Sequence, residues 1–463
     1  MLFTKYLINK KYNEYYIVID WATIRTTNYN LMINMIGKLK KISLGNWILI
    51  GMVLGLITGL FLNFYVTDPY IKKIILMDNV FYLGGNLFIK LMKMLVVPLV
   101  FFSIAVGVSS ISDVSKIGKI GGTTILIYLI TTAFAVTIAL GIGILIQPGL
   151  GLNMGSIAQS SNVTINQTMT DTILNMVPEN PFSSLSTGDM LPVIIFGLLI
   201  GIILAKIREE TETMNKVFSE GNRIMMEMTS IVMKFAPIGV FCLMARTFGG
   251  LGIEGIIPLT KYVICVLIGL AIQAFLVYPS MMVIFTRLNP IRFFRKFMSV
   301  MFFAFSSSTS NATIPLNINK LEDMGVSRDV SSFTIPLGAT INMDGTAIMQ
   351  GVAVMFAAQA YGIDLGTSAL LTVIFTAVMA SVGTAGVPSV GLVTLTMVFN
   401  SVGLPVQAIG VIFGIDHILD MFRTAVNITG DAICTIIVSF RNNGMDTDVF
   451  KGKKQPKKEK LIM

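Results

Sequence analysis

The stretch SSSTSNATIP, residues 306–315, interrupts an apolar segment that runs from Phe297 to Ile318. Its polar side chains are costly in lipid, and Pro315 removes a backbone hydrogen-bond donor. Irregular backbone at membrane depth is tolerated only where protein buries it or where it lines a water-filled cavity. We therefore predict a hairpin inside the membrane, with its polar tip turned toward protein or water.

Basic residues on both sides of this segment place its two ends on one face of the membrane. Arg292, Arg295 and Lys296 precede it, and Lys320 and Arg328 follow it. Because lysine and arginine concentrate in cytoplasmic loops, both ends are predicted to be cytoplasmic. A segment that starts and ends on the same side is re-entrant and does not span the membrane.

A second apolar segment, Leu365–Gly403, is interrupted in the same way by SVGTAGVP at residues 381–388. Each interrupted segment is followed by an apolar span, and the two segments enter from opposite faces. Paired broken segments in two inverted halves indicate a transport site near the middle of the membrane. The sequence leaves one alternative open, in which glycine and serine merely kink two ordinary helices.

The composition supports a membrane protein, because 54% of the 463 residues are hydrophobic and only 13% are charged. A soluble domain carries roughly 25% charged residues. Several apolar runs can cross, or nearly cross, a hydrocarbon core of ~30 Å as helix. These runs are Trp47–Val66, Thr123–Ile146, Met190–Ala205 and Tyr262–Phe285. We predict a polytopic helical membrane protein.

Charge placement predicts the orientation in the membrane. Residues 147–190 contain no lysine or arginine, whereas the loops around Lys40, Lys116 and Lys206 are basic. This alternation puts the N-terminus in the cytoplasm. The basic tail KGKKQPKKEK, residues 451–460, suits a cytoplasmic end beside anionic lipid and does not indicate nucleic-acid binding.

Three parts are expected along the chain. Residues 1–36 have mixed polarity and no signal-peptide pattern. They are either a natural extension or sequence upstream of a start at Met32 or Met35. Residues 37–440 form the membrane domain, and residues 441–463 form a basic cytoplasmic tail.

Catalytic chemistry finds little support in the sequence. His417 is the only histidine, which excludes a histidine-rich metal centre. Cys242, Cys265 and Cys434 lie in apolar runs, where cysteine serves as a small packing residue. A nucleophile within 306–310 would need a neighbouring base, and none is evident. We expect neither an enzyme nor an organic cofactor.

The last span carries a row of polar residues at helical spacing: Asp416, Asp420, Arg423, Asn427 and Asp431. At ~100° per residue they fall within about 80° of one helix face. Charged side chains in the membrane need partners or water, so this row is predicted to be a binding surface. An internal ladder of ion pairs is the alternative. Three aspartates against one arginine leave negative charge that bound cations would neutralise.

The preceding span contains Asn342 and Asp344, which lie about 200° apart on a regular helix. Both can reach one site only if the helix unwinds there, which Gly345 would permit. Unwound carbonyls with a carboxylate and an amide suit a hard cation such as Na⁺. A regular helix with Asp344 paired to a neighbour remains the alternative.

The polar row also suits an amino acid with a second carboxylate. Asp420 can bind its ammonium group, and Arg423 can bind a carboxylate through two parallel hydrogen bonds. The helix N-termini of the hairpins offer free N–H groups to the other carboxylate.

Together, the strings SSSTSNATIP (306–315), PLGATINMDGT (336–346), SVGTAGVP (381–388) and IDHILDMFRTAVNITGD (415–431) resemble the dicarboxylate/amino acid:cation symporter family, the glutamate transporters. The likeness covers residues 37–440 and is strongest after Phe297. It implies an all-α membrane protein with eight transmembrane helices, two re-entrant helical hairpins and inverted repeats, assembled as a homotrimer in the cell membrane. It also implies an elevator mechanism. The scaffold would comprise mainly 45–111 and 188–250, and the transport core mainly 120–147 and 256–440.

The resemblance assigns roles to individual residues. Substrate contacts would come from Ser310, Thr346, Val387, Gly391, Asp420, Arg423, Thr424 and Asn427. One sodium site would use Asp431 and Asn427 with carbonyl oxygens of Gly338 and Asn342. A second sodium site would use Tyr128, Thr131, Thr132, Asn342 and Asp344. A third would use backbone around Thr340, Met343, Ser381, Val382 and Thr384. The second hairpin would be the outer gate.

Arg423 bears on the substrate. Family members for neutral amino acids have a small or neutral residue there, so an arginine implies L-glutamate or L-aspartate carried with Na⁺. The alternatives are proton-coupled or mixed-cation uptake of C4-dicarboxylates or L-cystine, and, in a different class, an ion channel. Many relatives carry a second arginine where this chain has Ser308 or Met421, so the charge partner of Asp416 stays open.

Overall fold

A computed structural model describes the protein in residues 8–11, 14–17, 44–109, 118–152, 174, 177–188, 190–382 and 390–455. The chain divides into two units, Met1–Trp47 and Ile48–Met463. In the first unit, β1 (Ile8–Lys11) pairs antiparallel with β2 (Glu14–Ile17), and Lys11 lies opposite Glu14. The strands are rich in Ile and Tyr, and an opposite-charge pair across strands stabilises such a hairpin. The described residues from Leu44 onward are helical, apart from turns and one isolated bridge, as predicted.

The first half of the membrane domain contains eight helical elements among the described residues. They are α2 (Leu44–Tyr65), the π-helix η1 (Tyr70–Phe81), α3 (Tyr82–Ser109), α4 (Gly118–Ile146), α6 (Pro181–Thr187), α7 (Met190–Lys206), α8 (Glu212–Met233) and α9 (Ala236–Leu251). In this half α3 packs against α7, α8 and α9. Cys242 on α9 is buried with no disulfide, as expected of a packing residue.

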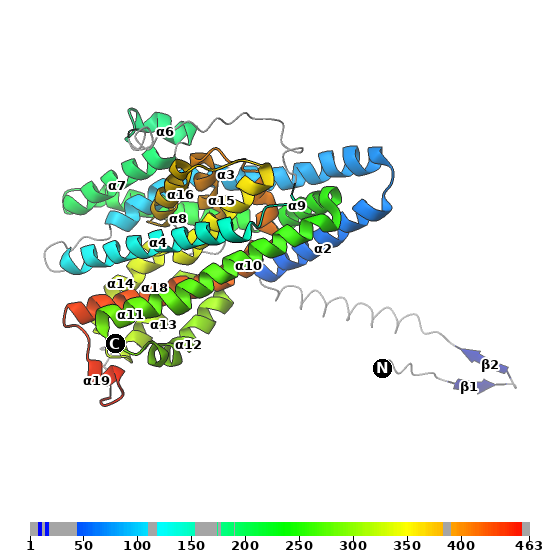
Figure 1. Cartoon of the computed structure of the whole chain (residues 1–463). Helices are drawn as coiled ribbons and strands as arrows, with labels where there is room; N and C mark the ends of the chain where they lie inside the picture. Colours follow the sequence, from blue (N-terminus) through cyan, green and yellow to red (C-terminus); the bar gives the residue numbers. More distant parts are fainter. Residues whose placement is uncertain are drawn as a thin grey trace. The chain divides into compact units, whose positions relative to one another are not determined.

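The second half begins with the 3₁₀ turn η3 (Gly252–Gly255). Its helices are α10 (Ile256–Ile272), the π-turn η4 (Gln273–Val277), α11 (Tyr278–Thr286), α12 (Pro290–Ser307), α13 (Ser310–Glu322), α14 (Arg328–Ile341), α15 (Asp344–Tyr361), α16 (Thr367–Val382), α17 (Val390–Ser401), α18 (Ala408–Arg441) and α19 (Thr447–Phe450). Helices α4, α10 and α15 lie side by side (Figure 1).

Five helical stretches among the described residues are long and apolar enough to cross a membrane. They are Asn46–Tyr65, Tyr70–Ser109, Ile120–Ile146, Ile256–Thr286 and Ile418–Arg441. Helices α8 and α9 add a sixth if this pair, bent by 52°, forms one span. The protein is therefore an integral membrane protein, and the count of eight spans stays a prediction.

Glycines on one face of α2 allow close helix packing. A Cβ built on Gly55 would lie 2.5 Å from the Phe241 carbonyl oxygen, and one on Gly59 would lie 2.8 Å from that of Ala245. A Cβ on Gly51 would collide with the Pro237 carbonyl. Small residues every four positions let membrane helices approach closely, so these glycines set the contact of α2 with α9.

The first predicted hairpin is confirmed as the pair α12 and α13. Asn289 caps the start of α12 by accepting a hydrogen bond from the Ile291 N–H, and the helix ends at Ser308, whose φ is 51°. The break is shorter than the polar stretch 306–315 suggested, because α13 begins again at Ser310 and contains Pro315. In the second hairpin α16 packs against α17, and its tip, 383–389, lies outside the described residues.

The predicted unwinding between α14 and α15 is also confirmed, at Asn342 and Met343. The role given to Gly345 was wrong, because this glycine lies inside α15 and not in the break. A Cβ there would lie 2.8 Å from the Arg423 carbonyl oxygen. Gly345 therefore permits close contact between α15 and α18.

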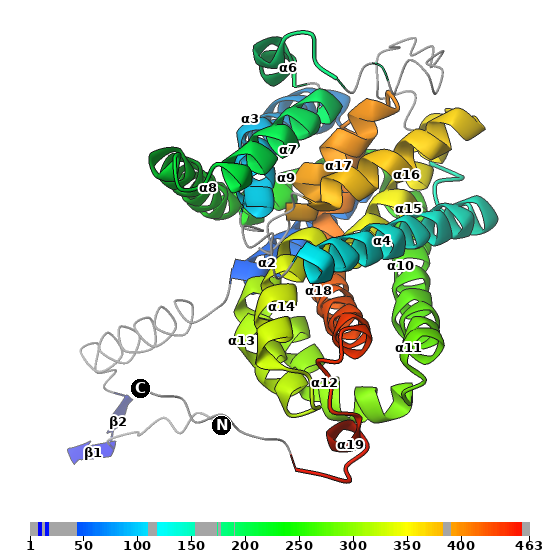
Figure 2. The same cartoon turned by 90° about the vertical axis from the view of Figure 1, so that its left-hand side faces the viewer.

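Helix α18 runs through the middle of the second half. It contacts α4, α9, α10, α11, α12, α13, α14, α15 and α17 (Figure 2). In the most apolar stretch of α18, 89% of the residues are buried inside the protein, whereas the figure for α2 is 28%. A polar helix can stay in the membrane only if protein covers it, and α18 meets this requirement.

The start of the C-terminal tail is folded, which corrects the prediction of a simple solvated end. Phe450 on α19 is 1% exposed. The Lys296 ammonium of α12 donates hydrogen bonds to the carbonyl oxygens of Val449 and Phe450, at 3.4 and 3.2 Å. Arg292 donates to the Lys451 carbonyl at 2.9 Å. Cations at a helix C-terminus are favourable, so the two basic side chains of α12 stabilise the C-terminal end of α19.

Phe450→Ala is expected to lower the free energy of unfolding by about 3 kcal/mol, because it empties a buried aromatic site. The thermal unfolding midpoint of purified protein measures this loss. Phe302, which is 67% exposed on α12, provides the matched control, since Phe302→Ala removes the same atoms from an open surface. Equal midpoints for the two variants would show that the α19 contact adds no stability.

Candidate functional site

Arg423 lies at the centre of the polar row on α18 and is fully buried. Its Nη1 is 2.7 Å from Asp416 Oδ1, and its Nη2 is 2.7 Å from Asp420 Oδ1. The charge partner of Asp416, which the sequence left open, is therefore Arg423. The two aspartates around one arginine leave a net negative charge at this point of α18.

One helical turn further on, Asn427 connects α18 to the break between α14 and α15. Its Oδ1 accepts a hydrogen bond from the Gly345 N–H at 2.7 Å, and its Nδ2 donates to Met343 Sδ at 3.3 Å. Asn342 donates from Nδ2 to Asp431 Oδ1 at 2.8 Å. The unwound residues of one span thus contact the polar row of the next.

Gly338 completes this corner. A Cβ built on it would lie 2.5 Å from Asp431 Oδ1 and 2.7 Å from the Tyr128 hydroxyl. Tyr128, on α4, donates its hydroxyl to the Thr334 carbonyl at 3.1 Å. Asp431, Tyr128 and Gly338 therefore meet where α4, α14 and α18 come together.

Asp344 is fully buried at the start of α15. Its Oδ1 accepts hydrogen bonds from Thr132 at 2.6 Å and Thr131 at 3.4 Å, both from α4. Its Oδ2 accepts from Gln273 Nε2 and from the Tyr278 hydroxyl, each at 2.8 Å. A carboxylate with this many donors can stay buried without a counter-charge in direct contact.

The first hairpin lies against the same part of α18. The rings of Phe305 on α12 and Phe422 on α18 meet edge to face, with 4.9 Å between their centroids. Asn317 on α13 donates to the Ile428 carbonyl at 3.4 Å. Ser310, at the start of α13, is buried.

The second hairpin approaches Arg423 through its second helix, α17. A Cβ built on Gly391 would lie 2.8 Å from Thr346 Cγ2 and 3.5 Å from Arg423 Nη1. A glycine at this position therefore lets α17 pack against Thr346 while its backbone lies beside the guanidinium. The end of α16 packs beside Tyr128, because Val382 belongs to one apolar cluster with Tyr128, Leu337 and Ile341.

The structure brings most of the predicted residues together. Thr424 follows Arg423 on α18, and its hydroxyl donates to the Asp420 carbonyl at 2.8 Å. Thr340 donates to the Leu337 carbonyl, and Ser381 to the Val378 carbonyl. Val387 and Thr384 lie outside the described residues.

A model of the sodium:dicarboxylate symporter family matches residues 44–440. The chain belongs to this family. It is a symporter and not an enzyme. The buried carboxylates, the unwound span and the polar row on α18 therefore belong to a transport protein.

Several curated proteins are similar to this symporter over most of its length. A proton/sodium-glutamate symport protein of Bacillus caldotenax is 36% identical over 410 residues, which cover 87% of this chain and 95% of the relative. A proton/glutamate-aspartate symporter of Escherichia coli K12 is 33% identical, over 86% of this chain and 93% of its own. Neutral amino acid transporter B(0) of Oryctolagus cuniculus is 32% identical, over 75% and 71%. The family thus includes proteins named for acidic and for neutral substrates.

Sequence reasoning missed two residues of the symporter's buried network, Gln273 and Tyr278. Both contact Asp344, yet they lie far from it in the sequence. An amide within the apolar run Tyr262–Phe285 was the available signal, since polar residues inside membrane spans mark functional sites.

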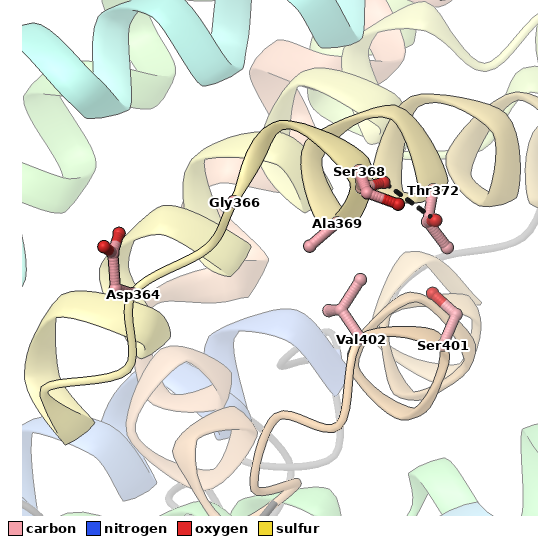
Figure 3. Close-up of a pocket in the computed structure, with 7 residues that line it drawn as sticks. All are labelled: Asp364, Gly366, Ser368, Ala369, Thr372, Ser401 and Val402. Atoms are coloured by element: carbon pink, nitrogen blue, oxygen red, sulfur yellow. Dashed lines mark hydrogen bonds between the residues drawn. The ribbon is translucent and has the colours of Figure 1, made fainter. Parts of the chain in front are cut away.

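A separate hollow lies between the start of α16 and the end of α17 (Figure 3). It is lined by Asp364, Gly366, Ser368, Ala369, Thr372, Ser401 and Val402. None of the predicted substrate or cation residues lines it, so it belongs to the base of the second hairpin and not to the site around Arg423.

Proposed function

We propose that this symporter imports an acidic amino acid, L-glutamate or L-aspartate, together with Na⁺. The substrate assignment rests on Arg423, whose fully buried guanidinium lies beside Gly391 at the start of α17. A buried cation in a pocket that takes zwitterions selects a substrate with an additional carboxylate. The relatives named for glutamate and aspartate support this choice.

Substrate binding is proposed to exchange partners at Arg423. The side-chain carboxylate of the substrate takes Nη2, which Asp420 now holds at 2.7 Å. Asp420 is thereby free to bind the substrate ammonium, so one ion pair becomes two. Asp416 keeps its contact with Nη1 and fixes the guanidinium plane. Thr424, Asn427, Ser310, Thr346, Gly391 and Val387 complete the proposed pocket.

The proposed cation sites use oxygen atoms, which Na⁺ prefers. Asn342 Oδ1 is buried and has no hydrogen-bond partner among the described residues, so its lone pairs are available to a cation. One proposed site combines Asp431 and Asn427 with carbonyls of Gly338 and Asn342. A second combines Asp344, Thr131, Thr132, Tyr128 and Asn342. The third uses backbone around Thr340, Met343, Ser381, Val382 and Thr384.

An elevator movement and a homotrimer are proposed with this function, with both termini in the cytoplasm. Two packing groups support the division into scaffold and transport core. In one, α3 packs against α7, α8 and α9, and in the other the hairpins and α14, α15 surround α18. The second hairpin would open as the outer gate.

Uptake by purified protein in liposomes tests the proposal. An inward Na⁺ gradient alone, at equal pH on both sides, is expected to concentrate radiolabelled aspartate or glutamate above the outside level. Replacing Na⁺ by choline should abolish accumulation, and C4-dicarboxylates, L-cystine and serine should compete poorly. Accumulation that persists in choline with a pH gradient would establish proton coupling instead, and a flux that never exceeds equilibrium would establish a channel.

A further inference from the structure

The two oxygens of the Asp344 carboxylate have different kinds of partner. On one side, Oδ1 accepts from the hydroxyls of Thr131 and Thr132 on α4. On the other side, Oδ2 accepts from Gln273 Nε2 and the Tyr278 hydroxyl, both at 2.8 Å. The carboxylate therefore has a threonine edge and a Gln273–Tyr278 edge.

The threonine edge can change its hydrogen bonding. The Thr131 and Thr132 hydroxyls also lie 2.9 and 2.8 Å from the Tyr128 carbonyl oxygen. Each hydroxyl has one hydrogen, so it donates either to Asp344 or to Tyr128. When both hydrogens turn to Tyr128, Asp344 Oδ1 and two hydroxyl oxygens present lone pairs to the same space. That arrangement suits a hard cation.

The Gln273–Tyr278 edge has no such freedom. The single hydrogen of the Tyr278 hydroxyl points to Oδ2, and Gln273 has two amide hydrogens, so it can donate to Oδ2 and to the Tyr278 oxygen together. Both side chains are fully buried, so water does not compete with Asp344 for their hydrogens. This edge keeps its two hydrogen bonds whichever way the threonines point.

A π-turn builds this edge. Residues five apart on an α-helix lie about 140° away from each other, so Gln273 and Tyr278 could not reach one oxygen from a regular helix. The turn η4 inserts between α10 and α11, and the Tyr278 N–H bonds to the Gln273 carbonyl across five residues. This wider turn stacks the two residues on one face, and such turns are frequent at functional sites.

Gly430 on α18 makes the approach possible. A Cβ there would collide with the Tyr278 hydroxyl and would lie 2.7 Å from Asn342 Nδ2. The bare backbone of α18 thus lets Tyr278 pass to Asp344 beside Asn342. A helix insertion and a glycine on a separate helix converge on the same carboxylate oxygen.

We propose that Gln273 and Tyr278 are positioning residues for cation coupling. They anchor Asp344 by Oδ2, so that Oδ1 faces the threonines and the incoming Na⁺. The inference rests on the proposed sodium site at Asp344 and extends it to two residues on η4 and α11. Loss of either anchor lets the carboxylate turn away from the cation.

The test uses Tyr278→Phe and Gln273→Met in purified full-length protein. The thermal unfolding midpoint is followed across a NaCl series, with choline chloride holding the ionic strength constant. In each variant the half-saturating Na⁺ concentration is expected to rise about tenfold, the usual effect of removing a residue that orients a metal ligand. Aspartate affinity at saturating Na⁺ should stay within about twofold.

Tyr262→Phe is the matched control, because Tyr262 is a fully buried tyrosine on the adjoining α10 whose hydroxyl has no partner among the described residues. It should leave the half-saturating Na⁺ concentration unchanged. A drop in midpoint that is equal in NaCl and choline would mean a purely structural role and would overturn the inference, as would Na⁺ dependence equal to that of Tyr262→Phe. A wild-type protein that Na⁺ does not stabilise would instead overturn the proposed function.

Discussion

Arg423→Cys is expected to weaken binding of aspartate and glutamate by about 2–5 kcal/mol, the cost of leaving a desolvated carboxylate without its partner. Neutral substrates such as serine or alanine lose nothing by this change and gain room, so they should bind to the variant. Equilibrium binding of labelled aspartate and serine to purified protein measures both effects. Arg423→Lys is expected to restore only part of the aspartate affinity, since an ammonium cannot form two parallel hydrogen bonds.

The structure adds a second consequence of Arg423→Cys. Asp416 and Asp420 both contact the guanidinium, so its removal leaves two buried carboxylates without this partner. Breaking a buried pair costs about 3–5 kcal/mol of stability. The affinity loss must therefore be measured at a temperature where the variant is folded.

Arg246→Cys is a suitable comparison for that measurement, because Arg246 on α9 contacts Asp78 at 3.7 Å and the Tyr82 ring, and neither is a predicted substrate residue. This variant should bind aspartate as the wild type does. If Arg423→Cys also bound aspartate with unchanged affinity, the substrate assignment would be wrong.

The hairpins and the interrupted span could be predicted because they leave local signals. Polar residues between Phe297 and Ile318 break an apolar run, and Asn342 and Asp344 cannot share a site on a regular helix. The polar row on α18 followed from spacing alone. Each of these features lies within one helix or one segment, so the hydrophobic pattern and the residue spacing of that segment are enough to predict it.

Individual side-chain contacts could not be predicted in the same way. The pairing of Arg423 with Asp416 depends on side-chain orientation, and the sequence allowed the Asp416 charge to have another partner. Gln273 and Tyr278 reach Asp344 only through a π-turn, which no periodicity of the segment announces. The burial of Phe450 against α12 could not be predicted, because the basic residues that follow it indicate a solvated tail. Each of these contacts depends on side-chain orientation, on a helix irregularity or on packing against another element, and periodicity reports none of these.

Asp344→Asn is expected to abolish Na⁺-driven accumulation while the protein still folds. The asparagine oxygen can face Gln273 and Tyr278 and accept both of their hydrogen bonds. Its amide group then faces Thr131 and Thr132, whose hydrogens can turn to the Tyr128 carbonyl so that their oxygens accept. Buried polar groups keep their partners in this arrangement, which limits the loss of stability.

The same rearrangement puts an N–H donor where the cation would sit. A site that loses its carboxylate and gains a donor is expected to bind Na⁺ at least a hundredfold more weakly, or about 3 kcal/mol, within the cost of truncating one member of a buried charge pair. Uptake into liposomes and the NaCl dependence of thermal unfolding measure this loss independently. Asp364→Asn is the control, because this exposed carboxylate lies in the loop before α16 (Figure 3). Wild-type Na⁺ dependence in Asp344→Asn would mean that the threonine edge of Asp344 binds no cation. The proposed positioning role of Gln273 and Tyr278 would then be wrong as well.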